Sequence, residues 1–221
     1  LSPILIVLLH KIWHLPQIAL ATLVNLANLF FISGFYLYFL WRLPQILQEE
    51  VWGKKPYQIG KNFLYGALTW IVAFPCVLFT AQLLSLFCLL VFRLVEPPPQ
   101  SVLQFLQLSA QHPFYLSLTL FAVLILAPFA EEVLFRGFLQ NYFRKHLGPK
   151  AAILLAALAF ALIHFSPSQG LGNIIILGSL FVLALFLGFI YEKQRSLIAP
   201  IALHFVFNSI SVINLFLFKK L

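Results

Sequence analysis

The hydrophobic residues of this chain fall into long runs, separated by short stretches that hold most of the glycine, proline and basic residues. A helix of roughly 20 apolar residues crosses a bilayer, because each residue adds about 1.5 Å of length. The pattern therefore predicts about six membrane-spanning helices, with a kink at Pro75 in the second. They are Ile18–Trp41, Asn62–Phe92, Phe114–Tyr142, Ala151–Phe165, Ile174–Tyr191 and Ile198–Phe218.

Composition agrees with this pattern. Hydrophobic residues make up 62% of the 221 residues, charged residues make up 9%, and the mean hydropathy is +0.98, which excludes a soluble globular domain. We therefore expect an all-α, polytopic transmembrane helix bundle in contact with the lipid bilayer. A short interfacial helix is expected over Ser101–Ala110, after the stop at Pro97-Pro98-Pro99.

The basic residues predict the orientation of the bundle. The net charge of +8 does not indicate nucleic-acid binding, because the basic residues form no single patch and lie in short loops between the apolar runs. By the positive-inside rule, the loops richer in Lys and Arg face the cytoplasm. That side carries Arg42, Lys54, Lys55, Lys61, Arg144, Lys145, Lys150, Lys193 and Arg195, and the other side carries Lys11, Arg93, Lys219 and Lys220.

Two adjacent carboxylates interrupt the third apolar run. The chain has no Asp, and Glu131 and Glu132 follow a stretch in which Ser117, Thr119 and Pro128 alone break the hydrocarbon. A charge at membrane depth costs roughly 2.5–3.5 kcal/mol on insertion scales and marks a function or a partner. Adjacent helical residues point about 100° apart, so the two glutamates should have different roles.

Arg136 stands four residues after Glu132, which is the favourable spacing for an ion pair on a helix. We therefore expect Glu132 to pair with Arg136 and Glu131 to face elsewhere without a local counter-charge. The alternative is that both glutamates belong to one salt-bridge network that joins helices.

Polar residues also stand in the fourth and sixth runs. His164 follows Phe160 by four residues, and a turn at Gly148-Pro149 between Glu131 and His164 would bring these two side chains to similar depth. His204 and Asn208 share one face of the sixth run at a spacing of four residues. Taken singly, each residue is explained by packing or by hydrogen bonds between helices.

Taken together, these residues suggest hydrolytic chemistry. Two imidazoles and a carboxylate, here His164, His204 and Glu131, are the ligand set of a catalytic zinc site with an open position for water. The same residues also suit a site in which Glu131 activates water without a metal. The residue types leave both mechanisms open.

The ordered set Glu131-Glu132-x-x-x-Arg136, Phe160-x-x-x-His164 and His204-x-x-x-Asn208 resembles the CAAX protease and bacteriocin-processing family of intramembrane endopeptidases, which includes the type II CAAX prenyl endopeptidase. The resemblance divides the chain into N-terminal segments without a motif, 1–113, and a catalytic helical core, 114–218. It implies a membrane protease that cleaves a lipidated or hydrophobic peptide, with its site open to the cytoplasmic side.

The resemblance also implies roles for the motif residues. Glu131 would be the general base, His164 would position the water or bind metal, and His204 would be a ligand or electrophile. Asn208 would stabilise the oxyanion, and Glu132, Arg136 and Phe160 would support these groups. Zinc is the expected metal if any is bound.

Two other functions fit the same residues. One is a proton- or cation-coupled transporter with Glu131 and the histidines as a relay, although no internal repeat is found. The other is a non-catalytic membrane immunity or scaffold protein. In a bacterium the protein would lie in the inner membrane, and in a eukaryote it would lie in the endoplasmic reticulum; the sequence identifies neither the substrate nor the oligomeric state.

Overall fold

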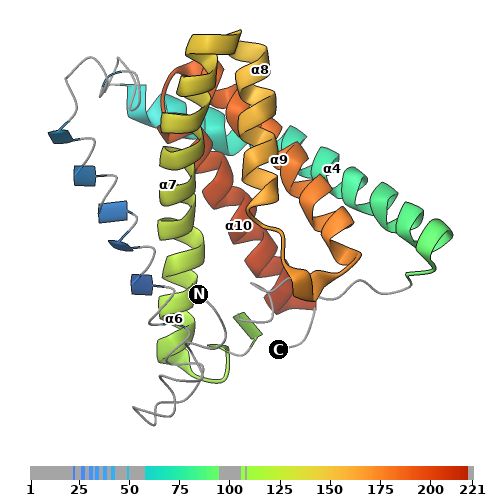
Figure 1. Cartoon of the computed structure of the whole chain (residues 1–221). Helices are drawn as coiled ribbons and strands as arrows, with labels where there is room; N and C mark the ends of the chain where they lie inside the picture. Colours follow the sequence, from blue (N-terminus) through green and yellow to red (C-terminus); the bar gives the residue numbers. More distant parts are fainter. Residues whose placement is uncertain are drawn as a thin grey trace.

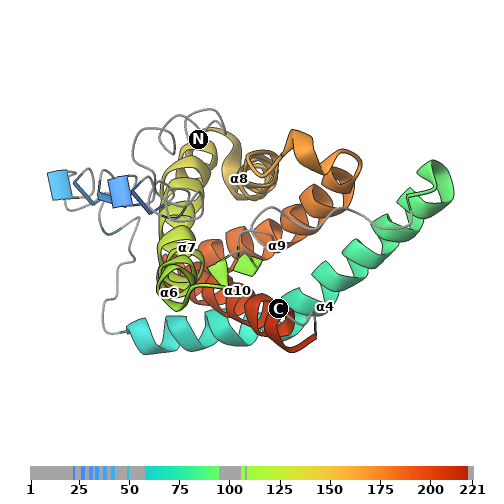
Figure 2. The ribbon, with the colours of Figure 1, turned by 90° about the horizontal axis from the view of Figure 1, so that it is seen from below.

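The structure is a computed structural model that describes residues 58–94 and 109–218, together with residues 106–107 and isolated residues between Thr22 and Glu49. Within these residues every regular element is a helix, which confirms the predicted all-α class. Four of the helices are long and apolar enough to cross a membrane. They pack as a bundle in which α4 (Ile59–Phe92) lies against both α9 (Gly172–Gln194) and α10 (Ile198–Phe218) (Figures 1 and 2).

The helix α4 spans Ile59–Phe92 and continues through Pro75. Its 34 residues correspond to about 51 Å, which exceeds the thickness of the hydrocarbon core of a bilayer. Most of its large apolar side chains are exposed, as expected for a helix that faces lipid. It approaches α10 closely at Gly66, where an added Cβ would lie only 2.0 Å from the carbonyl oxygen of Ala199.

Residues Pro113–Leu162 form a continuous helical stretch that reverses direction at Gly148. Gly148 has φ 81° and ψ 171°, a conformation that favours glycine, and Pro149 starts the return. The first arm consists of α6 (Pro113–Phe121), a π-helix η2 (Ala122–Leu126), α7 (Ala127–Glu132), a π-helix η3 (Val133–Gln140) and the start of α8 (Asn141–Leu162). The second arm is the rest of α8 and ends near His164. This is the predicted hairpin (Figure 1).

After a short 3₁₀ turn, η4 (Pro167–Gln169), the chain forms α9 (Gly172–Gln194) and α10 (Ile198–Phe218). Three side chains of the first arm contact α9 at a constant offset of 48 residues. Arg136 donates to the Ala184 carbonyl, Gln140 donates to the Gly188 carbonyl, and Arg144 pairs with Glu192. The constant offset shows that the first arm and α9 run parallel.

The described residues therefore contain α4, the two hairpin arms, α9 and α10, which correspond to five of the predicted segments. The first predicted segment, Ile18–Trp41, and the interfacial helix at Ser101–Ala110 lie largely outside the described residues. The division at residue 113 stays a prediction, and α4 packs directly against α9 and α10 of the proposed core.

Candidate active site

The two glutamates occupy α7, the short α-helical stretch between the two π-helices. They point to different environments, as their adjacency predicts. Glu132 is fully buried, whereas the side chain of Glu131 is 23% exposed and lines a cavity. π-Helical turns in longer helices are frequent at functional sites, and here they flank both carboxylates.

The predicted ion pair between Glu132 and Arg136 is present. Arg136 Nη1 lies 2.9 Å from Oε1 of Glu132, and neither side chain is exposed. Arg136 also donates through Nη2 to the carbonyl of Ala184 at 3.1 Å, and its guanidinium carbon lies 4.8 Å from the centre of the Phe160 ring. The guanidinium thus joins the first arm, the second arm and α9.

His204 comes from α10 and stands between the two glutamates. Its Nδ1 lies 2.8 Å from Oε1 of Glu132, and its Nε2 lies 3.8 Å from Oε2 of Glu131. A carboxylate in an ion pair can only accept, so Nδ1 carries the hydrogen. In the neutral ring, Nε2 is then an acceptor directed toward the Glu131 side of the cavity.

His164 lies beyond the end of α8 and lines the same cavity. Its Nδ1 donates to the carbonyl of Phe160 at 2.8 Å, which again leaves Nε2 as the free nitrogen. The Phe160 ring contacts both imidazoles, with its centre 4.9 Å from that of His164 and 5.9 Å from that of His204. The hairpin therefore brings Glu131 and His164 to one cavity. The imidazole that lies within 4 Å of the Glu131 carboxylate, however, belongs to His204.

Asn208 is tied to the first π-helix. Its Nδ2 donates to the carbonyl oxygen of Val123 at 3.0 Å. In the π-helical register the N–H of Ala127 bonds to the carbonyl of Ala122, so the carbonyl of Val123 would bond to the next residue, Pro128. Proline has no N–H, and the amide of Asn208 takes its place. One hydrogen of the Asn208 amide is thus committed, and the other remains.

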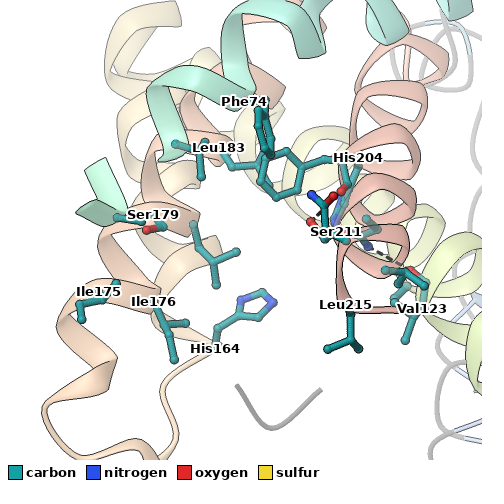
Figure 3. Close-up of a pocket in the computed structure, with 18 of the residues that line it drawn as sticks. Phe74, Val123, His164, Ile175, Ile176, Ser179, Leu183, His204, Ser211 and Leu215 are labelled. Atoms are coloured by element: carbon teal, nitrogen blue, oxygen red, sulfur yellow. Dashed lines mark hydrogen bonds between the residues drawn. The ribbon is translucent and has the colours of Figure 1, made fainter. Parts of the chain in front are cut away.

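The cavity has a volume of about 750 Å³ and is lined by α4, α7, α9, α10 and the residues after α8 (Figure 3). Glu131, His204 and Asn208 supply polar groups at one part of it. The walls from α4 and α9 are mainly apolar. They include Phe74, Val77, Leu78, Ala81, Ile175, Ile176, Leu180 and Leu183.

Several residues that line the cavity were not predicted from the sequence. The α4 residues carry no polar signal, so their side of the cavity could not be found from the sequence. Ser211 and Asn214 are different, because they extend the polar face of His204 and Asn208 along α10. The same rule that selected Asn208, a polar residue within an apolar run, would have selected Asn214.

The residues proposed as metal ligands do not form a ligand set. Zinc requires its ligand atoms at about 2.0–2.3 Å from one point. Throughout the described part of the chain, no group of three or more His, Cys, Asp or Glu side chains could hold one ion. His204 directs one nitrogen to Glu132, and His164 directs one nitrogen to the carbonyl of Phe160. The arrangement does not fit the predicted zinc site.

Comparison with known proteins gave one family. The family model described as Type II CAAX prenyl endopeptidase Rce1-like matches residues 113–210. The matched segment contains all three motifs and runs from the start of α6 into α10. Searches of curated proteins and of solved structures gave no match.

Proposed function

We propose a reaction for this chain on the premise that residues 113–210 belong to the type II CAAX prenyl endopeptidase family, whose members are membrane proteases. The reaction is hydrolysis of a peptide bond, within the bundle, in a lipidated or hydrophobic peptide. One observation carries this proposal: the partly exposed carboxylate of Glu131 and Nε2 of His204 face one another across 3.8 Å at the polar part of the cavity.

A separation of 3.8 Å is too long for a direct hydrogen bond and suits a water molecule that both groups contact. Glu131 is the proposed general base, and His204 accepts the second hydrogen of the same water. This assigns to His204 the water-positioning role that the family resemblance gives to His164. Glu132 supports the assignment, because its bond to Nδ1 fixes the tautomer in which Nε2 is an acceptor. His164, which lines the same cavity with its Nε2 uncommitted, then has the proposed role of holding the substrate peptide in position for attack.

In the proposed step, the water oxygen attacks the carbonyl carbon of the scissile bond while Glu131 takes one proton. The carbonyl oxygen becomes negatively charged and accepts a hydrogen bond from the uncommitted N–H of Asn208. Glu131 then gives the proton to the leaving nitrogen as the C–N bond breaks, which yields a carboxylic acid and an amine. Exclusion of bulk water by the apolar walls strengthens these interactions.

The cavity supports the substrate class. Its volume lies within the usual range of roughly 300–1,000 Å³ for ligand sites, and its apolar walls continue directly from the polar residues. A lipid chain or a hydrophobic side chain packed against α4 and α9 would place the neighbouring peptide bond beside Glu131. Leu78 lines the cavity and is also 45% exposed, and we propose that a lipid chain enters the cavity on this side, between the helices.

The test is cleavage of a quenched fluorescent peptide with a lipidated C-terminal Cys by the purified protein in detergent. The wild type should cleave it, and Glu131→Gln and His204→Ala should each lower kcat by at least about 100-fold. Ser168→Ala is the matched control, because Ser168 is exposed and does not line the cavity. Folded wild-type protein that cleaves neither lipidated nor plain hydrophobic peptides would reject the proposal and favour the transporter or scaffold functions.

A further inference from the structure

We propose that the cavity binds a hydrophobic primary amine in its protonated form. The ammonium group donates hydrogen bonds to the Glu131 carboxylate and to Nε2 of His204, and the apolar part of the molecule packs against α4 and α9. This inference goes beyond the proposed function, because it follows from the charges and hydrogen-bonding groups of the cavity and does not require that the protein hydrolyses a peptide.

The cavity carries a negative charge without a counter-charge. Glu131 is the one carboxylate among its described lining residues, and none of those residues is a Lys or an Arg. Arg136 lies on the same helical stretch, but its Nη1 is bonded to Glu132. The two glutamates and Arg136 therefore leave one net negative charge, and the free carboxylate is that of Glu131. In an apolar cavity, where the effective dielectric constant is lower than in water, such a group attracts a cation strongly.

The other polar atoms of the site are mainly hydrogen-bond acceptors. The Nδ1 hydrogens of His204 and His164 are directed to Glu132 and to the carbonyl of Phe160, so Nε2 of each neutral ring can only accept. Asn208 keeps its amide oxygen, because its bond to the backbone uses Nδ2. An ammonium group has three donors and no acceptor, which complements these atoms. A carboxylate or phosphate would instead meet acceptors and a like charge.

The spacing of the two principal acceptors suits one small donor. Oε2 of Glu131 and Nε2 of His204 are 3.8 Å apart, and a single nitrogen can lie at hydrogen-bonding distance, about 2.7–3.2 Å, from both. The proposed catalytic water uses the same two atoms. An ammonium group would replace this water and add an attraction between opposite charges, so a bound amine should inhibit cleavage.

An apolar wall begins next to this polar group. Phe207 follows His204 by one turn of α10 and packs on Phe74 of α4, with ring centres 6.2 Å apart. Phe74 and Leu183 line the same cavity as His204 (Figure 3). Along α10 the lining continues from His204 to Leu215, which corresponds to about 16 Å at 1.5 Å per residue. An alkyl chain of medium length therefore fits beside the ammonium group.

One consequence of this inference rests on the proposed function. Hydrolysis of a peptide bond releases an amine, and an amine takes up a proton at neutral pH. A product with an apolar residue at its new amino terminus would then have the chemistry that the cavity binds. We expect such products to inhibit the enzyme.

Binding is tested by thermal unfolding of the purified protein in a non-ionic detergent with decylamine, decanol or decyltrimethylammonium. The three probes share one alkyl chain. Decanol lacks the charge, and decyltrimethylammonium charges the micelle as decylamine does but cannot donate a hydrogen bond. Decylamine should stabilise the wild type at a concentration at least about tenfold lower than either other probe, as expected for hydrogen bonds between charged groups. If either other probe were equally effective, the proposal would be overturned.

Glu131→Gln keeps the size of the side chain and removes its charge, so it should abolish the advantage of decylamine over decanol. Ser168→Ala is the matched control, because Ser168 is exposed and lies outside the cavity lining, and it should keep the advantage. An unchanged advantage in Glu131→Gln would refute the site.

Inhibition of peptide cleavage gives a second measurement, which uses the wild type alone. Decylamine should raise KM without lowering kcat, at a concentration at least about tenfold lower than decanol. Cleavage that both probes inhibit equally would refute the amine site and leave the protease activity established. Absence of cleavage by the folded wild type would refute the proposed function, and the unfolding measurements would still decide whether the amine binds.

Discussion

His204 is held in place by Glu132, whose Oε1 lies 2.8 Å from Nδ1 of the imidazole. The same oxygen accepts from Arg136 at 2.9 Å, so one buried carboxylate both compensates the guanidinium and orients the ring. Glu131 makes no such bond and remains partly exposed in the cavity. The two glutamates therefore have separate roles: Glu132 holds Arg136 and His204 in place, and Glu131 is positioned to take part in the reaction.

This separation predicts different effects of the two Glu→Gln substitutions. Glu132→Gln removes the counter-charge that contacts buried Arg136, and breaking a buried pair costs about 3–5 kcal/mol. Glu131→Gln should abolish cleavage with little change in stability. Thermal unfolding of both variants in detergent, beside peptide cleavage, makes the comparison. Equal unfolding temperatures would contradict the assigned roles.

A second prediction concerns the bond between Asn208 and the carbonyl of Val123. Asn208→Ala leaves that partly buried carbonyl without its donor and should cost about 1–3 kcal/mol. Pro128→Ala supplies a backbone N–H at the position where the helix lacks one. In the double variant, we therefore expect most of the lost stability to return while cleavage stays impaired, because the amide is still absent.

Unfolding measurements on the wild type, the two single variants and the double variant give the coupling free energy directly. Additive losses would show that Pro128 and Asn208 do not act on the same carbonyl. Recovery of cleavage together with stability would show that Asn208 acts through the helix alone and does not contact the reacting peptide.

A third prediction concerns the contact between α4 and α10. The added Cβ of Gly66→Ala would lie 2.0 Å from the backbone oxygen of Ala199, so the two helices must move apart. We expect a loss of about 1–3 kcal/mol, as for other overpacked sites. Gly60→Ala is the control on the same helix, because nothing lies within 4 Å of its added Cβ. Equal stability of the two variants would refute the close contact.

A fourth prediction follows from the absence of a ligand set among the described residues. Treatment with a zinc chelator, followed by removal of the chelator, should leave the cleavage rate within about twofold of the untreated protein. Loss of cleavage that added zinc restores would show that Glu131, His164 and His204 rearrange around an ion, and would return the mechanism to a metal-bound water.

Much of this arrangement was predictable from local patterns. The spacing of Glu132 and Arg136 gave their ion pair, and Gly148-Pro149 gave the hairpin that brings His164 to the cavity with Glu131. These features depend on helical periodicity and on turn residues. Helical periodicity and turn residues can both be recognised within short stretches of sequence.

Other features depend on contacts between distant segments. The pairing of His204 with Glu132 joins residues 72 apart, and no sequence spacing specifies it. The π-helices on either side of α7 were not predicted either, because an apolar run reads alike in α and π registers. Pro128 and Asn208 hold part of the explanation, but only the fold shows that they meet at one carbonyl.

The last prediction concerns Asn173, which secures the segment that follows His164. Its Oδ1 accepts from the N–H of Ser166 at 3.0 Å, and its Nδ2 donates to the carbonyls of Ser166 and Gly170 at 2.8 and 2.9 Å. Asn173→Ala removes all of these bonds and should let the segment and His164 shift. Because misplacement by about 1 Å can lower a rate as much as 100-fold, we expect kcat to fall about 10- to 100-fold.

Asn173→Asp separates positioning from general stability, since it keeps the acceptor for Ser166 and loses both donors. The kcat of Asn173→Asp should lie between those of the wild type and Asn173→Ala. Ser168→Ala, in the same segment and exposed, should match the wild type. Steady-state kinetics with the lipidated peptide gives kcat and KM for each variant. A rise in KM with unchanged kcat would show that Asn173 shapes the cavity for binding and does not position His164 for the reaction.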